Sequence, residues 1–233
     1  MIVPIPPAID TGGMGTITFY GQDGSGPISA WDDMTPSANE ESWALTHGTI
    51  TAAAGGAATI DDVFSYSNSD LMDGLSLTVF HAPSDGTTAV KSSTEYGVQY
   101  TGVEGLTVGF ANGENNTSST STEGTNMYVT YAIDAFTVGV QDNETDSDGS
   151  LADSEFRAYG ISYAVSDDLS VSYNVSKVEH ENTSKSDQDA TGMSVSYTNG
   201  SVTVSASMNE VDNVGGTAAT DNSGYEINFV FAF

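Results

Sequence analysis

The stretch "LSVSYNVSKV", residues 169–178, alternates apolar and polar side chains over its first eight positions. Successive side chains of a β-strand point to opposite faces of a sheet, so this stretch is predicted to form a strand with one apolar and one polar face. A shift of one residue would turn every apolar side chain to the wrong face, which specifies the register of the strand. The apolar face holds Leu169, Val171, Tyr173 and Val175.

The same period of two recurs along the chain and predicts twelve strands. The connections between them alternate in length: "GVE", "IDA", "VSD" and "NG" are short, whereas "NGENNTSSTSTEGT" and "NETDSDGSLAD" are long and polar. Antiparallel neighbours give this alternation when one end of a sheet has tight turns and the other end has large loops. The predicted strands cover residues 15–20, 62–68, 74–82, 94–102, 105–112, 125–132, 135–143, 154–164, 168–178, 191–198, 201–211 and 223–233.

Several architectures use strands of this kind. A soluble β-sandwich usually has strands of about six residues, and a β-solenoid has a fixed repeat length, which this sequence lacks. A transmembrane barrel needs strands of about ten residues that are apolar on one face and polar on the other. The serines, threonines and asparagines of the polar face also suit the wall of a water-filled lumen. The sequence therefore predicts an all-β fold, a transmembrane antiparallel β-barrel.

The charge of the chain excludes several partners. The 233 residues include 4 Lys and Arg against 32 Asp and Glu, a net charge of −28. Such a surface repels nucleic acid and anionic lipid headgroups. Cysteine is absent, which excludes disulfides and cysteine-based metal sites. Residues 1–14 contain three prolines and no basic region, so they are predicted to be an irregular segment rather than a signal peptide.

The connection 21–61 is much longer than usual. It contains the acidic hook "WDDMTPSANEESW", residues 31–43, in which four carboxylates lie between the only two tryptophans of the chain. Ser37 followed by Glu40 matches a capping box, which predicts a short helix from Ser37 to Leu45. The hook is either a functional loop or a solvated acidic loop whose tryptophans are buried for stability.

Three features resemble general bacterial outer-membrane porins. The end of the chain resembles the C-terminal strand by which outer-membrane barrels are recognised for assembly, with an apolar residue at every second position. The connection 21–61, followed by a "DGL" turn at 73–75, resembles the third porin loop, which folds into the barrel as a constriction. The stretch "TGVEGLTVGFANGEN" at 101–115 is similar to porins of the alphaproteobacterial type. The assembly signal implied by this resemblance consists of Tyr225, Ile227, Phe229, Phe231 and Phe233.

The resemblance implies a porin barrel domain over residues 15–233, whose twelve strands are strands 5–16 of a sixteen-stranded barrel. The four N-terminal strands and the signal peptide then lie outside this sequence. It also implies a passive channel for small hydrophilic solutes and ions in the outer membrane of a Gram-negative bacterium. The implied partners are outer-membrane lipid, the barrel assembly machinery and further copies of the chain in a homotrimer.

In this interpretation the hook folds inward and narrows the pore. Carboxylates crowded in a constriction attract cations and repel anions, so the pore is expected to prefer cations. Trp31 and Trp43 are expected to anchor the hook on the wall, and Glu95 and Glu226 fall on the polar, lumen-facing side of their strands. The constriction residues are expected to be Asp32, Asp33, Glu40 and Glu41.

Other functions have weaker signals in the sequence. The carboxylate pairs lie on loops without a recognisable catalytic motif, so no enzyme is predicted. The three histidines are scattered without ligand spacing, and no cofactor is expected. "DSDG" at 146–149 lacks the glutamate of an EF-hand, although weak calcium binding by loop carboxylates stays open. The alternative function is an outer-membrane adhesin or receptor that acts through its acidic loops.

The loop lengths predict how the chain is oriented in the membrane. Bacterial barrels place their longer loops outside the cell, so protease added to intact cells should cleave the long loops and spare the short turn at 199–200. Cleavage confined to the short turns would reverse this orientation. The loops expected outside are centred near Asn115, Asp146, Glu181 and Gly215.

Overall fold

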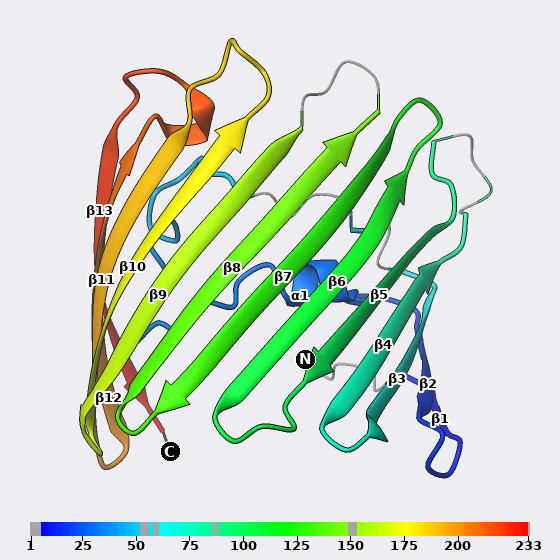
Figure 1. Ribbon diagram of the computed structural model, residues 1–233, viewed down its shortest axis with the longest axis horizontal. Helices are drawn as coiled ribbons and strands as arrows, with labels where there is room; N and C mark the ends of the chain where they lie inside the picture. The colour runs from blue at the N-terminus through cyan, green and yellow to red at the C-terminus, as the bar shows by residue number, and fades with distance from the viewer. Residues whose placement is uncertain are drawn as a thin grey trace. The chain divides into compact units, whose positions relative to one another are not determined.

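The computed structural model describes residues 6–51, 56–57, 61–84, 86, 89–148 and 153–232. Within these ranges thirteen strands form a single sheet whose order follows the chain, so that every strand is hydrogen-bonded to its neighbours in sequence (Figure 1). All of the pairings with described registers are antiparallel. The predicted all-β antiparallel fold is confirmed.

The elements of the sheet are long toward the C-terminus and shorter at the N-terminus. The strands are β1 (Ala8–Asp10), β2 (Thr16–Tyr20), β3 (Val63–Met72), β4 (Leu75–Ala82), β5 (Ser93–Tyr100), β6 (Leu106–Asn116), β7 (Ser121–Ile133), β8 (Phe136–Ser147), β9 (Ser154–Ser166), β10 (Leu169–His180), β11 (Gln188–Asn199), β12 (Val202–Asp212) and β13 (Asn222–Phe231). A short helix, α1 (Pro27–Ala30), and a 3-10 turn, η1 (Val214–Gly216), lie between strands. Among the described residues, no helix has the length and apolar character needed to cross a membrane.

The structure has one strand more than the twelve predicted. β1 lies in the segment that was expected to be irregular, and it pairs with β2 so that Ala8 lies opposite Thr18. A strand of three residues is too short to show a recognisable alternation. Its conformation depends instead on pairing with β2 and on the turn between them, where the N–H of Thr11 donates to the carbonyl of Gly15 at 3.0 Å.

Contacts divide the chain into two compact units. In the second unit, tight turns at 167–168 and 200–201 join strands at one end, and the larger connections 181–187 and 213–221 lie at the other end (Figure 1). Gly200, the first residue of the two-residue turn after Asn199, has a φ of 61°, a conformation that glycine adopts readily and that favours it at this position of a hairpin. The first unit comprises Met1–Asp32, Ala53–Met127 and Asn143–Asp153; the second comprises Asp33–Ala52, Tyr128–Asp142 and Ser154–Phe233.

The two faces of the sheet differ in chemistry. The long loop connects β2 to β3 over residues 21–62. The inner face is the one on which the described residues of this loop pack, and the outer face is the opposite one. On the outer face of the second unit, side chains directly opposite one another form an apolar row across five strands. Each of these side chains is at least 40% exposed. The row consists of Ile161, Tyr173, Met193, Met208 and Tyr225.

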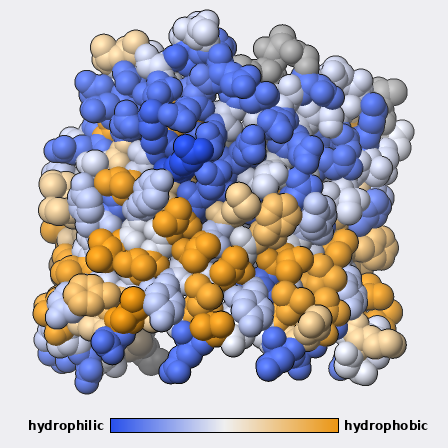
Figure 2. All heavy atoms as spheres, viewed as in Figure 1, coloured by the Kyte–Doolittle hydropathy of each residue, from blue (hydrophilic) through white to orange (hydrophobic). Residues whose placement is uncertain are grey.

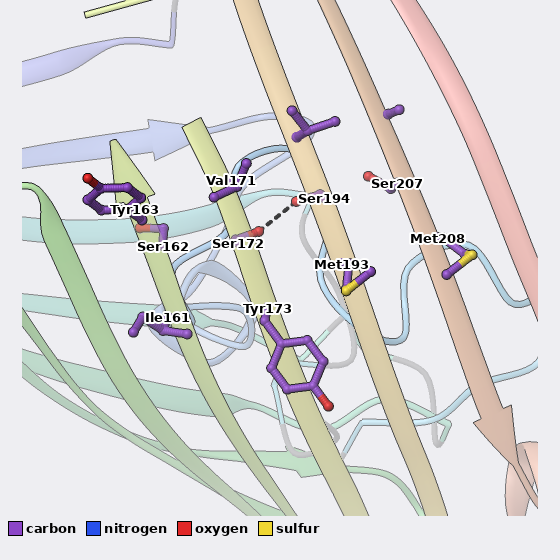
Figure 3. Close-up of a pocket in the computed structure, with 12 residues that line it drawn as sticks. Ile161, Ser162, Tyr163, Val171, Ser172, Tyr173, Met193, Ser194, Ser207 and Met208 are labelled. Carbon is purple, nitrogen blue, oxygen red and sulfur yellow. Dashed lines mark hydrogen bonds between the residues drawn. The ribbon is translucent and has the colours of Figure 1, made fainter. Parts of the chain in front are cut away.

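Figure 3 shows part of this row around a shallow apolar hollow of about 550 Å³. Ser172 and Ser194 alternate with the outer-face residues along β10 and β11, and their hydroxyl groups are hydrogen-bonded to each other at 2.7 Å. Both serines are buried, whereas Tyr173 and Met193 beside them are exposed. The predicted alternation of an apolar and a polar face is therefore present in these strands.

The polarity of the outer face changes along each strand. Figure 2 shows apolar side chains gathered in a band nearer the tight turns and hydrophilic side chains toward the long connections. β8 illustrates the change, because its outer-face residues are apolar over the first half and acidic over the second. In chain order these residues are Phe136, Val138, Val140, Asp142, Glu144 and Asp146.

Small apolar clusters lie under the long loop on the inner face. In the second unit, Trp43 of the loop packs with Phe156, Ala158 and Val178 of the sheet. The rings of Trp43 and Phe156 meet edge to face, with 4.9 Å between centroids and 88° between planes. A separate cluster in the first unit consists of Val63, Phe80 and Ala82. Apolar contacts thus fasten parts of the loop region to an otherwise polar face.

Candidate functional site

The first limb of the long loop, residues 21–32, forms α1 against the inner face of β4, β5 and β6. Pro27 begins the helix, where its missing N–H removes no intrahelical hydrogen bond. The N–H groups of Ala30 and Trp31 donate to the carbonyls of Gly26 and Pro27, each at 3.0 Å. A helix of four residues shows no periodic pattern, and the sequence did not predict it.

A buried carboxylate binds both this limb and Ala57, near the end of the long loop. Glu95 of β5 is only 2% exposed, and its two oxygens accept hydrogen bonds from the N–H groups of Ile28 (3.0 Å) and Ala57 (2.6 Å). A Cβ atom at Gly26 or Gly113 would overlap the Glu95 side chain, so both glycines leave room for it. Glu95 lies on the inner face but is covered by the loop. It binds the loop rather than presenting a free charge to water.

The first limb ends at Trp31 and Asp32. The ring of Trp31 occupies the space that a side chain at Gly97 would fill. The carbonyl of Asp32 accepts a hydrogen bond of 3.1 Å from the side-chain amide of Asn143. Burial raises the pKa of the Asp32 carboxyl, and a hydrogen bond from its own backbone opposes that rise. Both residues are therefore held against the inner face of the sheet, here called the wall, in the first unit.

The second limb, residues 33–51, does not contain the predicted helix. The Ser37 hydroxyl does not cap a helix but donates to the Glu41 carboxylate at 2.8 Å. The next backbone N–H groups, those of Ala38 and Asn39, donate to the hydroxyl groups of Ser172 (2.9 Å) and Ser194 (3.1 Å). The prediction was wrong: Ser37, Ala38 and Asn39 take their hydrogen-bond partners from Glu41 and from the wall, and the chain follows these partners instead of turning about a helical axis.

Polar residues of the wall bind this limb at successive points. The amide of Asn174 donates to the carbonyl of Pro36 at 2.9 Å, and that of Asn209 donates to the carbonyl of Glu41 at 2.8 Å. The hydroxyl groups of Ser42 and Ser176 are 3.1 Å apart. From the sequence, the serines and asparagines of the wall were recognised only as a polar face. Their role in binding the loop was missed, because no local sequence pattern shows the path that the loop takes.

The acidic side chains of the second limb differ in exposure. Asp33 is exposed, whereas Glu40 and Glu41 are partly buried. Burial raises the pKa of Glu40, and the nearby carboxylates of Glu41 and Glu226 raise it further. Glu226 extends from the inner face of β13 and accepts a hydrogen bond from Asn228 at 2.6 Å. Glu40, Glu41 and Glu226 thus form one region of negative charge on the inner face.

A family comparison accounts for this combination of sheet and loop. The family model described as "Gram-negative porin" matches residues 9–198. The chain belongs to the Gram-negative porin family. No curated protein matches the sequence. Family membership identifies the protein as an outer-membrane porin.

Solved structures agree with the porin fold. Outer-membrane expressed OmpT of Vibrio cholerae is 16% identical with a TM-score of 0.68, and the match covers 94% of this chain and 77% of OmpT. Salmonella typhi OmpF in a complex with daunomycin is 14% identical with a TM-score of 0.71, covering 97% of this chain and 76% of OmpF. At these identities the similarity concerns the fold alone.

The cations of this porin lie in connections between strands or on the outer face. All four are among the described residues, and Lys91 and Lys185 lie in connections between strands. Arg157 and Lys177 lie opposite each other on the outer face of β9 and β10. Arg157 pairs with Asp142 and Glu155, and Lys177 pairs with Glu179 and Asp187. No cationic side chain in a described strand therefore opposes the acidic inner region.

The last strand carries the implied assembly signal. Tyr225, Ile227, Phe229 and Phe231 share the outer face of β13, and each is more than half exposed. Phe231 lies opposite Val202 of β12. Phe233 lies outside the described residues.

The acidic loop residues that could bind calcium are only partly described. Residues 149–152, which include Gly149 of the "DSDG" stretch, lie outside the described ranges. In the described part of the chain, no three His, Asp or Glu side chains are grouped closely enough to hold a metal ion. Asp153 instead accepts a hydrogen bond of 2.8 Å from the N–H of Ser147.

We predict that Glu95→Gln loosens the first limb of the loop. One of the two backbone N–H groups loses its acceptor oxygen, and a hydrogen bond to a charged group contributes about 1.5–3 kcal/mol. Single-channel recording should show more open-channel noise, with assembly intact. Glu123→Gln is the matched control, because Glu123 accepts a hydrogen bond from Asn112 in an exposed pair. Equal noise in the two variants would contradict this role for Glu95.

Proposed function

We propose that this porin is a passive diffusion channel for small hydrophilic solutes, that it prefers cations, and that the long loop is its constriction. One observation carries the proposal. Hydrogen bonds hold the acidic second limb along the inner face of the second unit, and no cationic side chain of a described strand lies on that face. No chemical step is proposed.

Electrostatics supports the preference for cations. The four hook carboxylates are Asp32, Asp33, Glu40 and Glu41, and the whole chain has a net charge of −28. At about 0.1 M salt the Debye length is roughly 10 Å, so charges on the rim of a wide pore are screened from passing ions. Carboxylates on a loop that narrows the lumen act at shorter range and in a lower dielectric.

We propose that the sheet closes as a barrel of sixteen strands in which β2–β13 are strands 5–16. An open sheet in a bilayer would leave unpaired N–H and C=O groups along its edges, and each such group costs several kcal/mol. The proposed partners are outer-membrane lipid on the apolar outer face and the barrel assembly machinery at β13. No resident cofactor is proposed, and calcium bound by the loop acids would be weak.

An adhesin or receptor that acts through its acidic loops is the alternative. It shares the barrel but needs no ionic current. Planar-bilayer recording separates the two functions, because a protein that inserts without ever raising the conductance is not a channel. The loop-lined polar wall favours the channel, since an adhesin has no need of carboxylates on the inner face.

We predict that neutralising the hook lowers the cation preference. In a salt gradient, the variant with Asp32 and Asp33 changed to Asn and Glu40 and Glu41 changed to Gln should show a smaller reversal potential than the parent. A matched control changes four outer-face carboxylates to Gln and should keep the parent value. The same permeability ratio in parent and hook variant, with conductance retained, would exclude the hook as the filter. The control residues are Glu114, Glu123, Glu144 and Glu210.

We also predict that the cation preference depends on pH. The pKa values of Asp32 and Glu40 are raised, chiefly by burial. Both groups are charged above their raised pKa values and lose charge as the pH falls through them. The cation preference should therefore begin to decline at a pH above the range in which carboxyl groups ordinarily titrate. A reversal potential that stays constant until the ordinary range is reached would contradict this prediction.

We predict that the porin assembles as a trimer. Porin similarity supports a homotrimer, and unheated electrophoresis should show a large SDS-resistant species that becomes monomeric on boiling. A monomer under every mild condition would contradict the trimer.

A further inference from the structure

Asn39 lies in the middle of the hook and is hydrogen-bonded to three strands of the second unit. Its N–H donates to the Ser194 hydroxyl on β11 at 3.1 Å, and its Oδ1 accepts from the Ser205 hydroxyl on β12 at 2.6 Å. Its Nδ2 group donates to the Ser207 hydroxyl at 2.8 Å and to Glu226 Oε1 on β13 at 3.2 Å. Both ends of one side-chain amide are therefore used in binding the wall.

The position of Asn39 connects it to the acidic region. Glu40 and Glu41 follow it directly in the chain, and Glu226 is its partner on the wall. The carboxylates of Glu40 and Glu226 are close enough to interact. Like charges at such range repel each other, so the acidic limb needs a neutral donor to stay beside Glu226. The amide of Asn39 supplies that donor.

We propose that Asn39 is a positioning residue for the ion filter: its amide holds the second limb against β12 and β13 and so sets where Glu40 and Glu41 lie in the pore. This inference rests on the proposed function of the loop as a constriction. An ordinary loop asparagine would contribute hydrogen bonds without influencing ion selectivity. Isosteric substitution distinguishes the two roles.

The primary test is Asn39→Asp. The new carboxylate has nearly the same shape as the amide, but it cannot donate and it faces the Glu226 carboxylate. If Asn39 only fills space, one more negative charge in the constriction raises the cation preference. If Asn39 positions the limb, the loss of two hydrogen bonds releases the limb from the wall, and the cation preference falls. The channel should then spend about ten times longer in displaced states with a noisy current.

Asn112→Asp is the matched control, because Asn112 also donates to a glutamate, Glu123, at 2.7 Å, but in an exposed pair. It makes the same chemical change away from the loop and should leave selectivity and noise at the parent values. A rescue variant combines Asn39→Asp with Glu226→Gln, which exchanges the donor and the acceptor and restores the parent charge. If Asn39 positions the limb, this rescue variant should recover the parent's ion selectivity and its low open-channel noise.

A second readout reports the place of the limb independently of ion selectivity. The chain has no cysteine, and the hydroxyl groups of Ser42 and Ser176 are 3.1 Å apart, so Ser42→Cys with Ser176→Cys should form a disulfide readily. Adding Asn39→Asp should slow its formation about tenfold, and adding Glu226→Gln as well should restore the rate.

These measurements separate the inference from the proposed function. Slower disulfide formation in a protein whose parent shows no cation preference would support the positioning role and refute the proposed selectivity. An unchanged disulfide rate together with a higher cation preference in Asn39→Asp would overturn the positioning role. If Asn39→Asp does not assemble, the rescue variant tests the positioning role instead. Failure of the rescue variant to assemble or to form the disulfide would also overturn that role.

Discussion

A backbone amide removed from water needs a hydrogen-bond partner, and the long loop of this porin takes its partners from the wall. The N–H groups of Ile28, Met34 and Ile50 donate to side chains of Glu95, Gln141 and Gln188 at 3.0, 2.6 and 3.2 Å. Most of the loop has no regular secondary structure that could satisfy these groups internally. The polar positions of the inner face therefore decide the course of the loop, and the remaining features of the site depend on them.

The strand period makes this arrangement possible. Most apolar residues of β10, β11 and β12 face outward, so most of the alternate positions are free to be small or polar. Glycine takes this role where loop atoms approach the sheet most closely. A Cβ at Gly139 would overlap Pro36, and one at Gly192 would overlap the backbone of Ser42. At these glycines the loop thus packs directly against strand backbone that carries no side chain, close to the side chains that bind the loop.

The distribution of charge follows from the same division of faces. Arg157 and Lys177 lie on the outer face with carboxylate partners, in ion pairs that are exposed and therefore contribute little stability. On the inner face, carboxylates lie without cations from the described strands. Glu95 is stabilised there by two backbone N–H groups, while Glu40 and Glu226 lie close enough to repel each other. Negative charge is thereby retained beside the loop, where it can act on ions.

The sequence by itself determined the strands, their antiparallel order, the polarity of the two faces and the porin resemblance, because period-two alternation and connection length are local properties of a chain. It missed β1 and α1, which are too short to show a period. It also predicted a helix from Ser37 to Leu45, where the tertiary structure provides Ser172 and Ser194 as partners 134 and 155 residues away. Glu95 was expected on the lumen-facing side, and only the tertiary structure shows that its carboxylate binds the backbone of the loop. The physical reason is that a loop backbone follows the groups that satisfy its hydrogen bonds, and here those groups lie on the wall, far away in sequence.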